Sequence, residues 1–165
     1  MTGRRSIVRR ALGCLLISAF MSLAARAQTL QIIDPDGHAT AVTAAQIANL
    51  PHHTIDVRDH DKPAQFEGVP LAALFAMAGI QLGDALRGPR LTEILLVEAA
   101  DGYKVVFALA ETDPAFTTRE IILADKRDGR PLDAKEGPFR IVAPGDKRPA
   151  RWIRQVIAMK IISAK

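Results

Sequence analysis

Thiols are almost absent from this chain, whose single cysteine is Cys14 among 165 residues. Cys14 lies near the start of an N-terminal apolar stretch, which makes it a poor site for lipid attachment because most of the stretch follows it. From residue 15 onward no side chain can form a disulfide or donate a thiolate to a metal. Disulfide scaffolds and thiolate-held metals are therefore excluded for that part of the chain.

Long apolar runs are also lacking. Residues 11–25 form an apolar stretch of about 15 residues, shorter than the run of about 20 that a spanning helix needs. A basic segment precedes it and a small-x-small site ends at Ala27, which is the three-part pattern of a cleavable export signal. Arg4-Arg5 also fits the twin-arginine pattern. We therefore expect residues 1–27 to be removed and residues 28–165 to be periplasmic, exported by the Sec or twin-arginine route, without membrane insertion.

An excess of positive charge is missing once this leader is set aside. The leader carries five arginines and no acid, so the 22 basic side chains of the whole chain fall to 17, against 18 acidic ones. Binding to nucleic acid through the overall field of a protein needs a basic face or stripe. We therefore expect no nucleic-acid partner, and the remaining cations matter only as local clusters.

Known catalytic and metal-binding motifs are scarce. The chain has no Gly-x-Ser-x-Gly, His-Glu-x-x-His or phosphate-loop motif. His52, His53 and His60 lie near Asp59 and Asp61, but adjacent histidines on a strand point to opposite faces and the spacing of a four-ligand site is missing. We therefore predict no catalytic residue and no metal site.

Short strands separated by turn residues make up most of the remaining sequence. Strands outnumber helices and do not alternate regularly with them, which favours an α+β domain with mixed sheets. No repeat or linker divides residues 28–165, so we expect one domain. The expected strands are 29–33, a second one leading to residue 43, 54–57, two strands within 91–109 around Asp101-Gly102, one within 119–132, 139–143 and 156–162.

Two short helices are expected between these strands. Thr43 is a suitable cap for a helix that continues to Leu50. Pro70 suits the first turn of a second helix and Gly79 the position just past its end, so residues 70–78 are predicted to be helical. The buried face of that helix is expected to carry Leu71, Leu74, Phe75 and Ala78. Residues 58–68, rich in charged side chains, are predicted to form a polar loop.

Three segments resemble the molybdopterin-binding domain of the sulfite oxidase family, especially its short exported bacterial members. They are FEGVPLAALFAMAGI, DGYKVVFAL and LADKRDGRPLDAKEGPFRIVAPGDKRPARWIRQV, and the resemblance covers roughly residues 66–162. It implies a sulfite oxidase-like fold, with mixed β-sheets and a few short helices. It also implies a pterin or molybdopterin-like ligand.

The segment PGDKRPARWIRQV is the part that the resemblance places against the pterin and its phosphate. The residues that would bind the pterin or another anion are Lys147, Arg148, Arg151, Trp152 and Arg154. The resemblance also brings Arg130 near the site, and Tyr103 is a further candidate for the pocket.

Physical reasoning supports such a site without excluding a structural role. Pro149 can begin a short helix with free N–H groups, and Arg148, Arg151 and Arg154 recur every third residue and would share a face. An arginine fork suits phosphate or a ring carbonyl, and Trp152 could stack on a flat ring. Alternatively, the indole packs in the core and the arginines form surface pairs.

One departure from the family concerns the metal. Catalytic members hold molybdenum through a cysteine on a loop before the Gly-Val-Pro-Leu helix, and residues 52–70 contain none. Carboxylates of Asp56, Asp59 or Asp61 suit harder ions. We therefore expect molybdenum chemistry to be absent.

Three functions follow from this reading. The first is a non-catalytic exported pterin-binding protein, acting as a periplasmic pterin sensor or accessory protein beside a membrane signalling or redox protein. The alternatives are a molybdopterin-dependent oxidoreductase without a cysteine ligand, and a structural or interaction protein that has kept the fold and lost the ligand.

Overall fold

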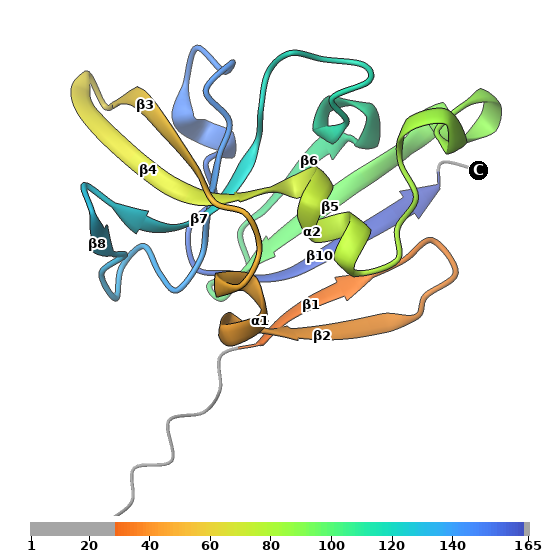
Figure 1. Cartoon of the computed structure of the whole chain (residues 1–165), viewed down its shortest axis with the longest axis horizontal. Helices are drawn as coiled ribbons and strands as arrows, with labels where there is room; N and C mark the ends of the chain where they lie inside the picture. Colours follow the sequence, from red (N-terminus) through yellow and green to blue (C-terminus); the bar gives the residue numbers. More distant parts are fainter. Residues whose placement is uncertain (1–28, 164–165) are drawn as a thin grey trace, which may run out of the picture.

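Two β-sheets with a few short helices form residues 29–163, the part of the chain that this computed structural model describes (Figure 1). The expected leader, residues 1–27, lies outside the described residues. Mixed sheets and short helices are the features of the predicted α+β class. Between residues 29 and 163, no helix combines the length and the apolar character that crossing a membrane requires.

The first sheet has the strand order β2-β1-β10-β5-β6. It is mixed, because β1 runs parallel to β10 while the other neighbouring pairs are antiparallel. Its strands agree with the strands expected from the apolar alternation of the sequence. They are β1 (Thr29–Ile33), β2 (Ala39–Thr43), β5 (Glu93–Ala99), β6 (Lys104–Ala108) and β10 (Val156–Ser163).

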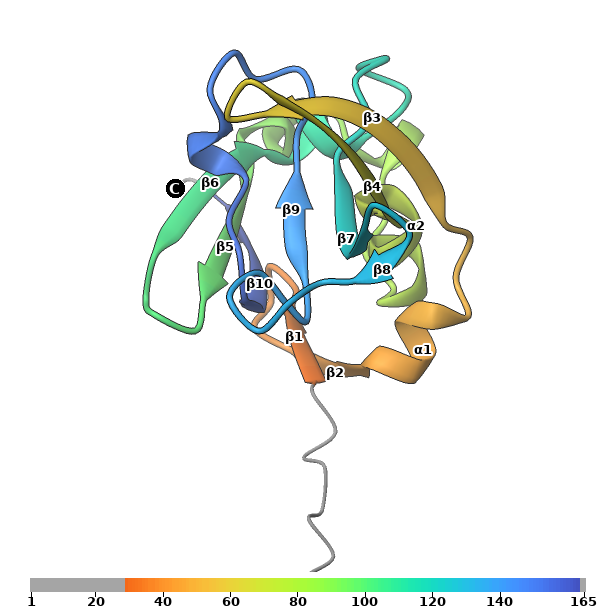
Figure 2. The ribbon, with the colours of Figure 1, turned by 90° about the vertical axis from the view of Figure 1, so that its left-hand side faces the viewer.

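The second sheet has the order β3-β4-β7-β8, and β9 pairs with β7. Figure 2 shows β9 between the strands of the first sheet and β7. Backbone hydrogen bonds also join β9 to the segment before β10, because Ile141 N donates to Ile153 O over 2.8 Å. The strands are β3 (His53–Asp59), β4 (Lys62–Pro70), β7 (Ile122–Arg127), β8 (Arg130–Pro131) and β9 (Arg140–Val142).

The prediction of a polar loop at residues 58–68 is wrong. These residues are the end of β3, a turn at His60-Asp61 and most of β4. Both turn residues have positive φ, 48° and 66°, as in the two-residue turns that match the twist of a hairpin. Ala64 and Phe66 point inward along β4, whereas Gln65 between them faces solvent. Most of the charged residues that indicated a loop therefore belong to the exposed face and turn of a hairpin, while Asp59 is buried.

Both expected α-helices are present. α1 (Ala44–Ala48) begins after Thr43, whose Oγ1 accepts from Gln46 N over 3.2 Å while Gln46 Oε1 accepts from Thr43 N over 2.9 Å. This reciprocal pair is a capping box. Four 3₁₀-helices complete the described helical segments: η1 (Gly83–Ala85), η2 (Gly88–Thr92), η3 (Leu109–Thr112) and η4 (Pro149–Arg151).

The second α-helix, α2 (Leu71–Met77), follows Pro70 directly and stops before Gly79, whose φ is 80°. Glycine adopts this left-handed conformation without the steric cost that other residues incur. The predicted inner face is largely confirmed, because Leu71, Leu74 and Phe75 are fully buried while Ala78 is half-buried.

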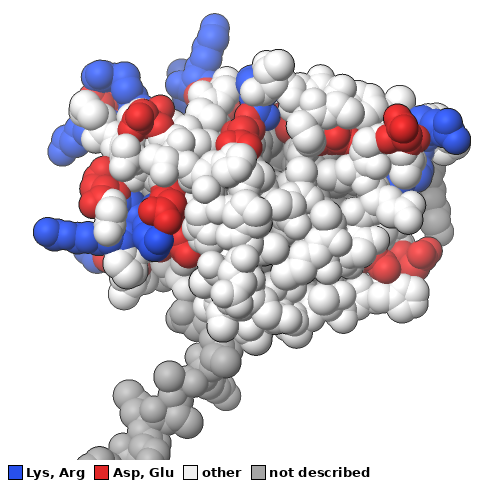
Figure 3. Space-filling view, viewed as in Figure 1, with Lys and Arg blue, Asp and Glu red and all other residues white. Residues whose placement is uncertain are grey.

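A single cluster of buried apolar side chains draws on both sheets and on α2. Charged residues gather over the end of the molecule that carries β3, β4 and β8, while the surface over α1 and α2 shows few of them (Figure 3). The sequence explains this contrast, since residues 39–54 and 68–83 contain no Lys, Arg, Asp or Glu. Sites that need charge chemistry are therefore favoured at the β3–β4 end.

Candidate functional site

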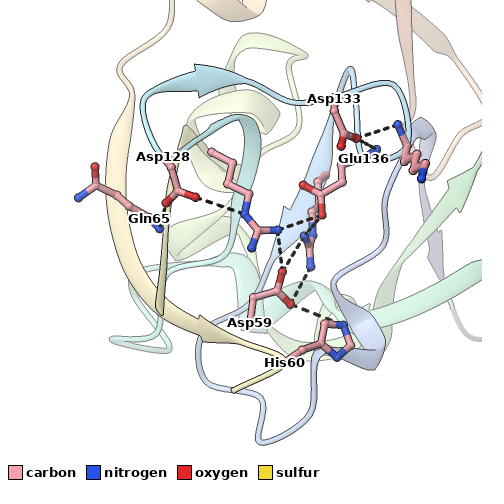
Figure 4. A network of polar contacts seen from close by, with 9 residues as sticks. Asp59, His60, Gln65, Asp128, Asp133 and Glu136 are labelled. Carbon is pink, nitrogen blue, oxygen red and sulfur yellow. Dashed lines mark hydrogen bonds and ion pairs between the residues drawn. The ribbon is translucent and has the colours of Figure 1, made fainter. Parts of the chain in front are cut away.

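A buried charge cluster, defined as Asp59, Arg127, Glu136 and Arg140, lies at the β3–β4 end (Figure 4). Asp59 ends β3 and is 4% exposed, and Arg140 begins β9 and is 3% exposed. Arg140 donates to Asp59 over 3.1 and 3.3 Å and to Glu136 over 2.7 Å. Arg127 donates to the same two carboxylates over 3.1 and 3.2 Å. Two cations thus share two anions, which compensates for burying charge.

Aromatic rings enclose the Arg140 guanidinium. Its central carbon lies 4.9 Å from the centre of the Phe66 ring and 5.8 Å from that of Trp152. The two rings meet edge to face, with their centres 6.4 Å apart. Arg140 Nε is buried and has no hydrogen-bond partner among residues 29–163. The cluster therefore has one buried donor without a partner among these residues.

An open cleft of about 890 Å³ lies against the buried charge cluster. Its walls come from the β3–β4 turn, the turn before β6, the segment between β8 and β9, and the segment from η4 to β10. Five basic and three acidic side chains line it, so the net charge of the lining is positive. They are Lys62, Arg127, Lys135, Arg140 and Arg154, with Asp59, Asp101 and Glu136.

Three of the predicted site residues meet in this cleft: Tyr103, Trp152 and Arg154. Tyr103 is 51% exposed, and its hydroxyl donates to Ala150 O over 3.1 Å, which holds the ring across the edge of the cleft. Arg154 is exposed. Lys147, Arg148 and Arg130 are exposed and do not line the cleft.

Trp152 takes the structural role that the sequence left open as the alternative. Its side chain is 5% exposed, and Nε1 donates to Ala143 O over 2.8 Å. Because Phe66 and Arg140 cover the ring, its face is not free to stack on a ligand. The difference from the expected stacking platform arises because the indole packs against Phe66 of β4 and Arg140 of β9.

Arg151 also differs from the expectation. Its guanidinium lies 4.3 Å from the centre of the Phe107 ring and pairs with Asp146 over 2.6 Å and Glu111 over 3.3 Å. The hydrogen bond to Asp146 raises the pKa of Arg151 above its usual value, and Glu111 adds to this effect. Arg151 Nη1 also contacts Val106 O over 3.3 Å, at the edge of β6.

The expected shared face of Arg148, Arg151 and Arg154 does not form. η4 contains only three residues and ends at Arg151, so the helical period stops before it reaches Arg154. Arg151 lines a separate cavity of about 220 Å³, whereas Arg154 lines the cleft. A three-residue 3₁₀-helix is too short to offer the anion site expected at its start.

The histidines make separate contacts. His53 Nδ1 lies 2.8 Å from Glu120 Oε1, and His60 Nε2 lies 3.7 Å from Asp59 Oδ1. His52 instead faces Asp125, with 3.2 Å between Nε2 and Oδ2. In the part of the chain that the structure describes, three candidate ligand atoms come together at Asp34, Asp36 and His38 in the exposed β1–β2 turn.

Sequence reasoning missed the buried charge cluster. Asp59 was considered only as an oxygen ligand for a metal, and Arg127, Glu136 and Arg140 were not considered as site residues. A signal was present at Arg140, which interrupts the apolar run of residues 139–143. A charge inside a buried strand needs partners of opposite charge. The sequence alone does not identify them, because Asp59 lies 81 positions away.

Comparison with known proteins gives a match in structure alone. No family model and no curated protein sequence matches the chain. Among the 28 solved chains that match is the sulfane dehydrogenase SoxCD from Paracoccus pantotrophus, with a TM-score of 0.64 and 18% sequence identity. The match covers 82% of this chain and 38% of that chain, so the protein spans well under half of its neighbour's length. At this identity the likeness concerns the fold: the protein shares the fold of a part of this dehydrogenase.

Proposed function

We propose that the protein is a non-catalytic pterin-binding domain whose ligand lies in the cleft beside the buried charge cluster. The observation that carries the proposal is the cleft itself, about 890 Å³ in volume with a net positive lining. Its volume is within the range of small-molecule sites. The shared fold with part of SoxCD and the resemblance of residues 66–162 to a molybdopterin-binding domain point to the same ligand class.

The lining suits a flat, polar heterocycle. A pterin ring carries both donors and acceptors along its edge, and the cleft offers guanidinium and ammonium donors together with carboxylate acceptors. Arg154 provides a planar donor fork for a ring carbonyl or an anionic substituent. Tyr103 takes the aromatic role first expected of Trp152, because its ring is half exposed at the cleft edge. Arg140 Nε adds a buried donor that lacks an acceptor among the described residues.

The donor set does not fit a thiolate-held molybdenum. The chain has no cysteine after Cys14. Asp59, a carboxylate at the cleft, already accepts hydrogen bonds from two guanidinium groups and is almost fully buried. The residues therefore support binding of the organic part of such a cofactor, and on this ground we assign a non-catalytic role.

Export and partner remain part of the proposal. The three-part pattern of residues 1–27 favours a periplasmic protein. A non-catalytic pterin protein there would act as a sensor or accessory protein, and its partner would be a membrane signalling or redox protein.

Two arginines of one segment provide a sharp test. Arg154 lines the cleft, whereas Arg148 is equally exposed, carries the same charge and does not line it. We expect biopterin or tetrahydrobiopterin to bind with measurable heat in titration calorimetry. Arg154→Ala should weaken binding by about tenfold, the loss of one charge-assisted hydrogen bond. Arg148→Ala should change affinity by less than about twofold.

Other outcomes would contradict the proposal. Calorimetry without heat for either pterin, combined with unchanged Trp152 emission, would argue for a structural protein that has lost the ligand. Equal losses in the two arginine variants would mean that the pterin does not occupy this cleft.

A further inference from the structure

A second cavity, of about 540 Å³, lies next to the cleft and has a different chemistry. The two hollows share Ala134 and Gln155 in their walls. Gln155 Nε2 donates to Ala134 O over 2.7 Å, and Gln155 itself holds a left-handed conformation with φ 51°. This contact forms a partition between the two hollows. The second cavity is therefore separate from the cleft, and its ligand can differ from the ligand of the cleft.

Apolar side chains form most of the wall of this cavity. Leu132, Pro138, Phe139, Val156 and Ile157 line it, and Ile157 is 42% exposed at its rim. No lysine, arginine or histidine is among its lining residues. Such a wall favours the apolar body of an organic molecule and offers nothing to neutralise an anion.

Two carboxylates complete the lining, and they differ in what they already bind. Asp133 Oδ1 accepts from the backbone N–H groups of Lys135 and Glu136, over 2.8 and 3.0 Å. That carboxylate stabilises the turn before β9. Asp125 comes from β7, and its carboxylate makes fewer hydrogen bonds than that of Asp133.

Only one oxygen of Asp125 has a partner. Oδ2 lies 3.2 Å from His52 Nε2, and His52 Nδ1 lies 2.8 Å from Leu50 O, so the imidazole contacts both the carboxylate and the carbonyl oxygen. Oδ1 is buried and has no hydrogen-bond partner in the described range 29–163. A buried acceptor without a donor is costly, and a carboxylate gains most from a charged donor.

We propose that this cavity binds a small organic ammonium ion, with its apolar body against Leu132 and Ile157 and its N–H group donating to Asp125. A metal ion is a poor fit, because hard cations require about six or more oxygen ligands and this lining has two carboxylates among mostly apolar walls. An organic anion is excluded by the two carboxylates. A neutral alcohol could donate one hydrogen bond but would lack the charge attraction.

The test compares benzylamine with benzyl alcohol, which share the ring and differ in the charged donor. Each is titrated into the ¹⁵N-labelled protein, up to about 10 mM. We expect benzylamine to shift the amide signals of Leu132 and Ile157 saturably and to bind about tenfold more tightly than benzyl alcohol. The signals of Arg154 and Tyr103 in the cleft should remain in place, which separates this result from pterin binding.

Two variants that remove the same charge complete the experiment. Asp125→Asn keeps the shape and should weaken benzylamine binding by about tenfold. Asp36→Asn, in the exposed β1–β2 turn, should leave it within about twofold. If Asp125→Asn unfolds the protein, Ile157→Ser at the rim is the substitute and should weaken both compounds alike. Equal binding of amine and alcohol, shifts outside this cavity, or no saturable shift would overturn the proposal.

Discussion

Asp59 and Glu136 each face both Arg127 and Arg140, so the buried charge cluster depends on every member. Removing Asp59 would leave Arg140, which is 3% exposed, to Glu136, a carboxylate that it shares with Arg127. Breaking a buried pair in this way is far more costly than removing a surface pair. One substitution in the cluster should therefore disturb the ion pairs of all its members.

We expect Asp59→Asn to lower the free energy of unfolding by about 3 kcal/mol, because the uncharged amide cannot balance the buried Arg140 guanidinium. Urea denaturation followed by circular dichroism measures this. Asp61→Asn is the matched control, since Asp61 is exposed two residues further on, in the hairpin turn, where its change should stay within about 0.5 kcal/mol. Similar losses in both variants would show that the cluster adds no particular stability.

At the scale of the element, local pattern was a good guide where one face of a segment is apolar. The strands at 29–33 and 156–162 and the helix after Pro70 could be predicted because alternation, caps and glycine ends act within a few residues. The β3–β4 hairpin could not, because its outer face is charged and its turn lacks the usual Asn-Gly or Asp-Gly pair. The length of η4 could not be predicted either, because a helix of three residues is too short to show a periodic pattern in the sequence.

The two hairpin turns offer a reciprocal test. His60-Asp61 and Asp128-Gly129 both have positive φ, but only the second has glycine at its second position. Asp61→Gly places a glycine at the same position of the first turn. It should raise the free energy of unfolding by about 0.5 kcal/mol, because glycine adopts a φ of 66° without steric cost. Gly129→Asp should lower it by about 1 kcal/mol. Melting temperatures that move in the same direction for both variants would contradict this account.

At the scale of the whole molecule, the cleft is assembled from segments that are distant in sequence. Tyr103 and Arg154, both named as candidates from the sequence, line its wall, and their role in binding stays a prediction. The sequence did not offer Arg140 as a candidate, and offered Asp59 only as a metal ligand, because their meeting depends on pairing within the second sheet between strands that are distant in sequence. Trp152 lies shortly before β10 of the first sheet and joins it to the second, in edge contact with Phe66 of β4 and close to Arg140 of β9.

This position makes the indole a probe of the shared core. We expect the protein to unfold in one cooperative transition, with Trp152 emission and far-ultraviolet circular dichroism giving the same urea midpoint, because one apolar cluster spans both sheets. The emission should shift to longer wavelength as the 5%-exposed ring meets water. Separate midpoints for the two signals would mean that the sheets unfold independently.

The contacts of Tyr103 with Ala150 O and of Arg151 with Val106 O have a consequence for the outer strands of the first sheet. They lay the η4 segment over β6, which is one edge of that sheet. The opposite edge, β2, exposes Ala39, Thr40 and Ala41 and carries neither a charge nor a proline, the usual protections of an edge strand. Within residues 29–163, strand addition by another chain would thus meet the η4 segment at β6 but only unprotected strand residues at β2, so we expect β2 to be the edge more prone to pairing.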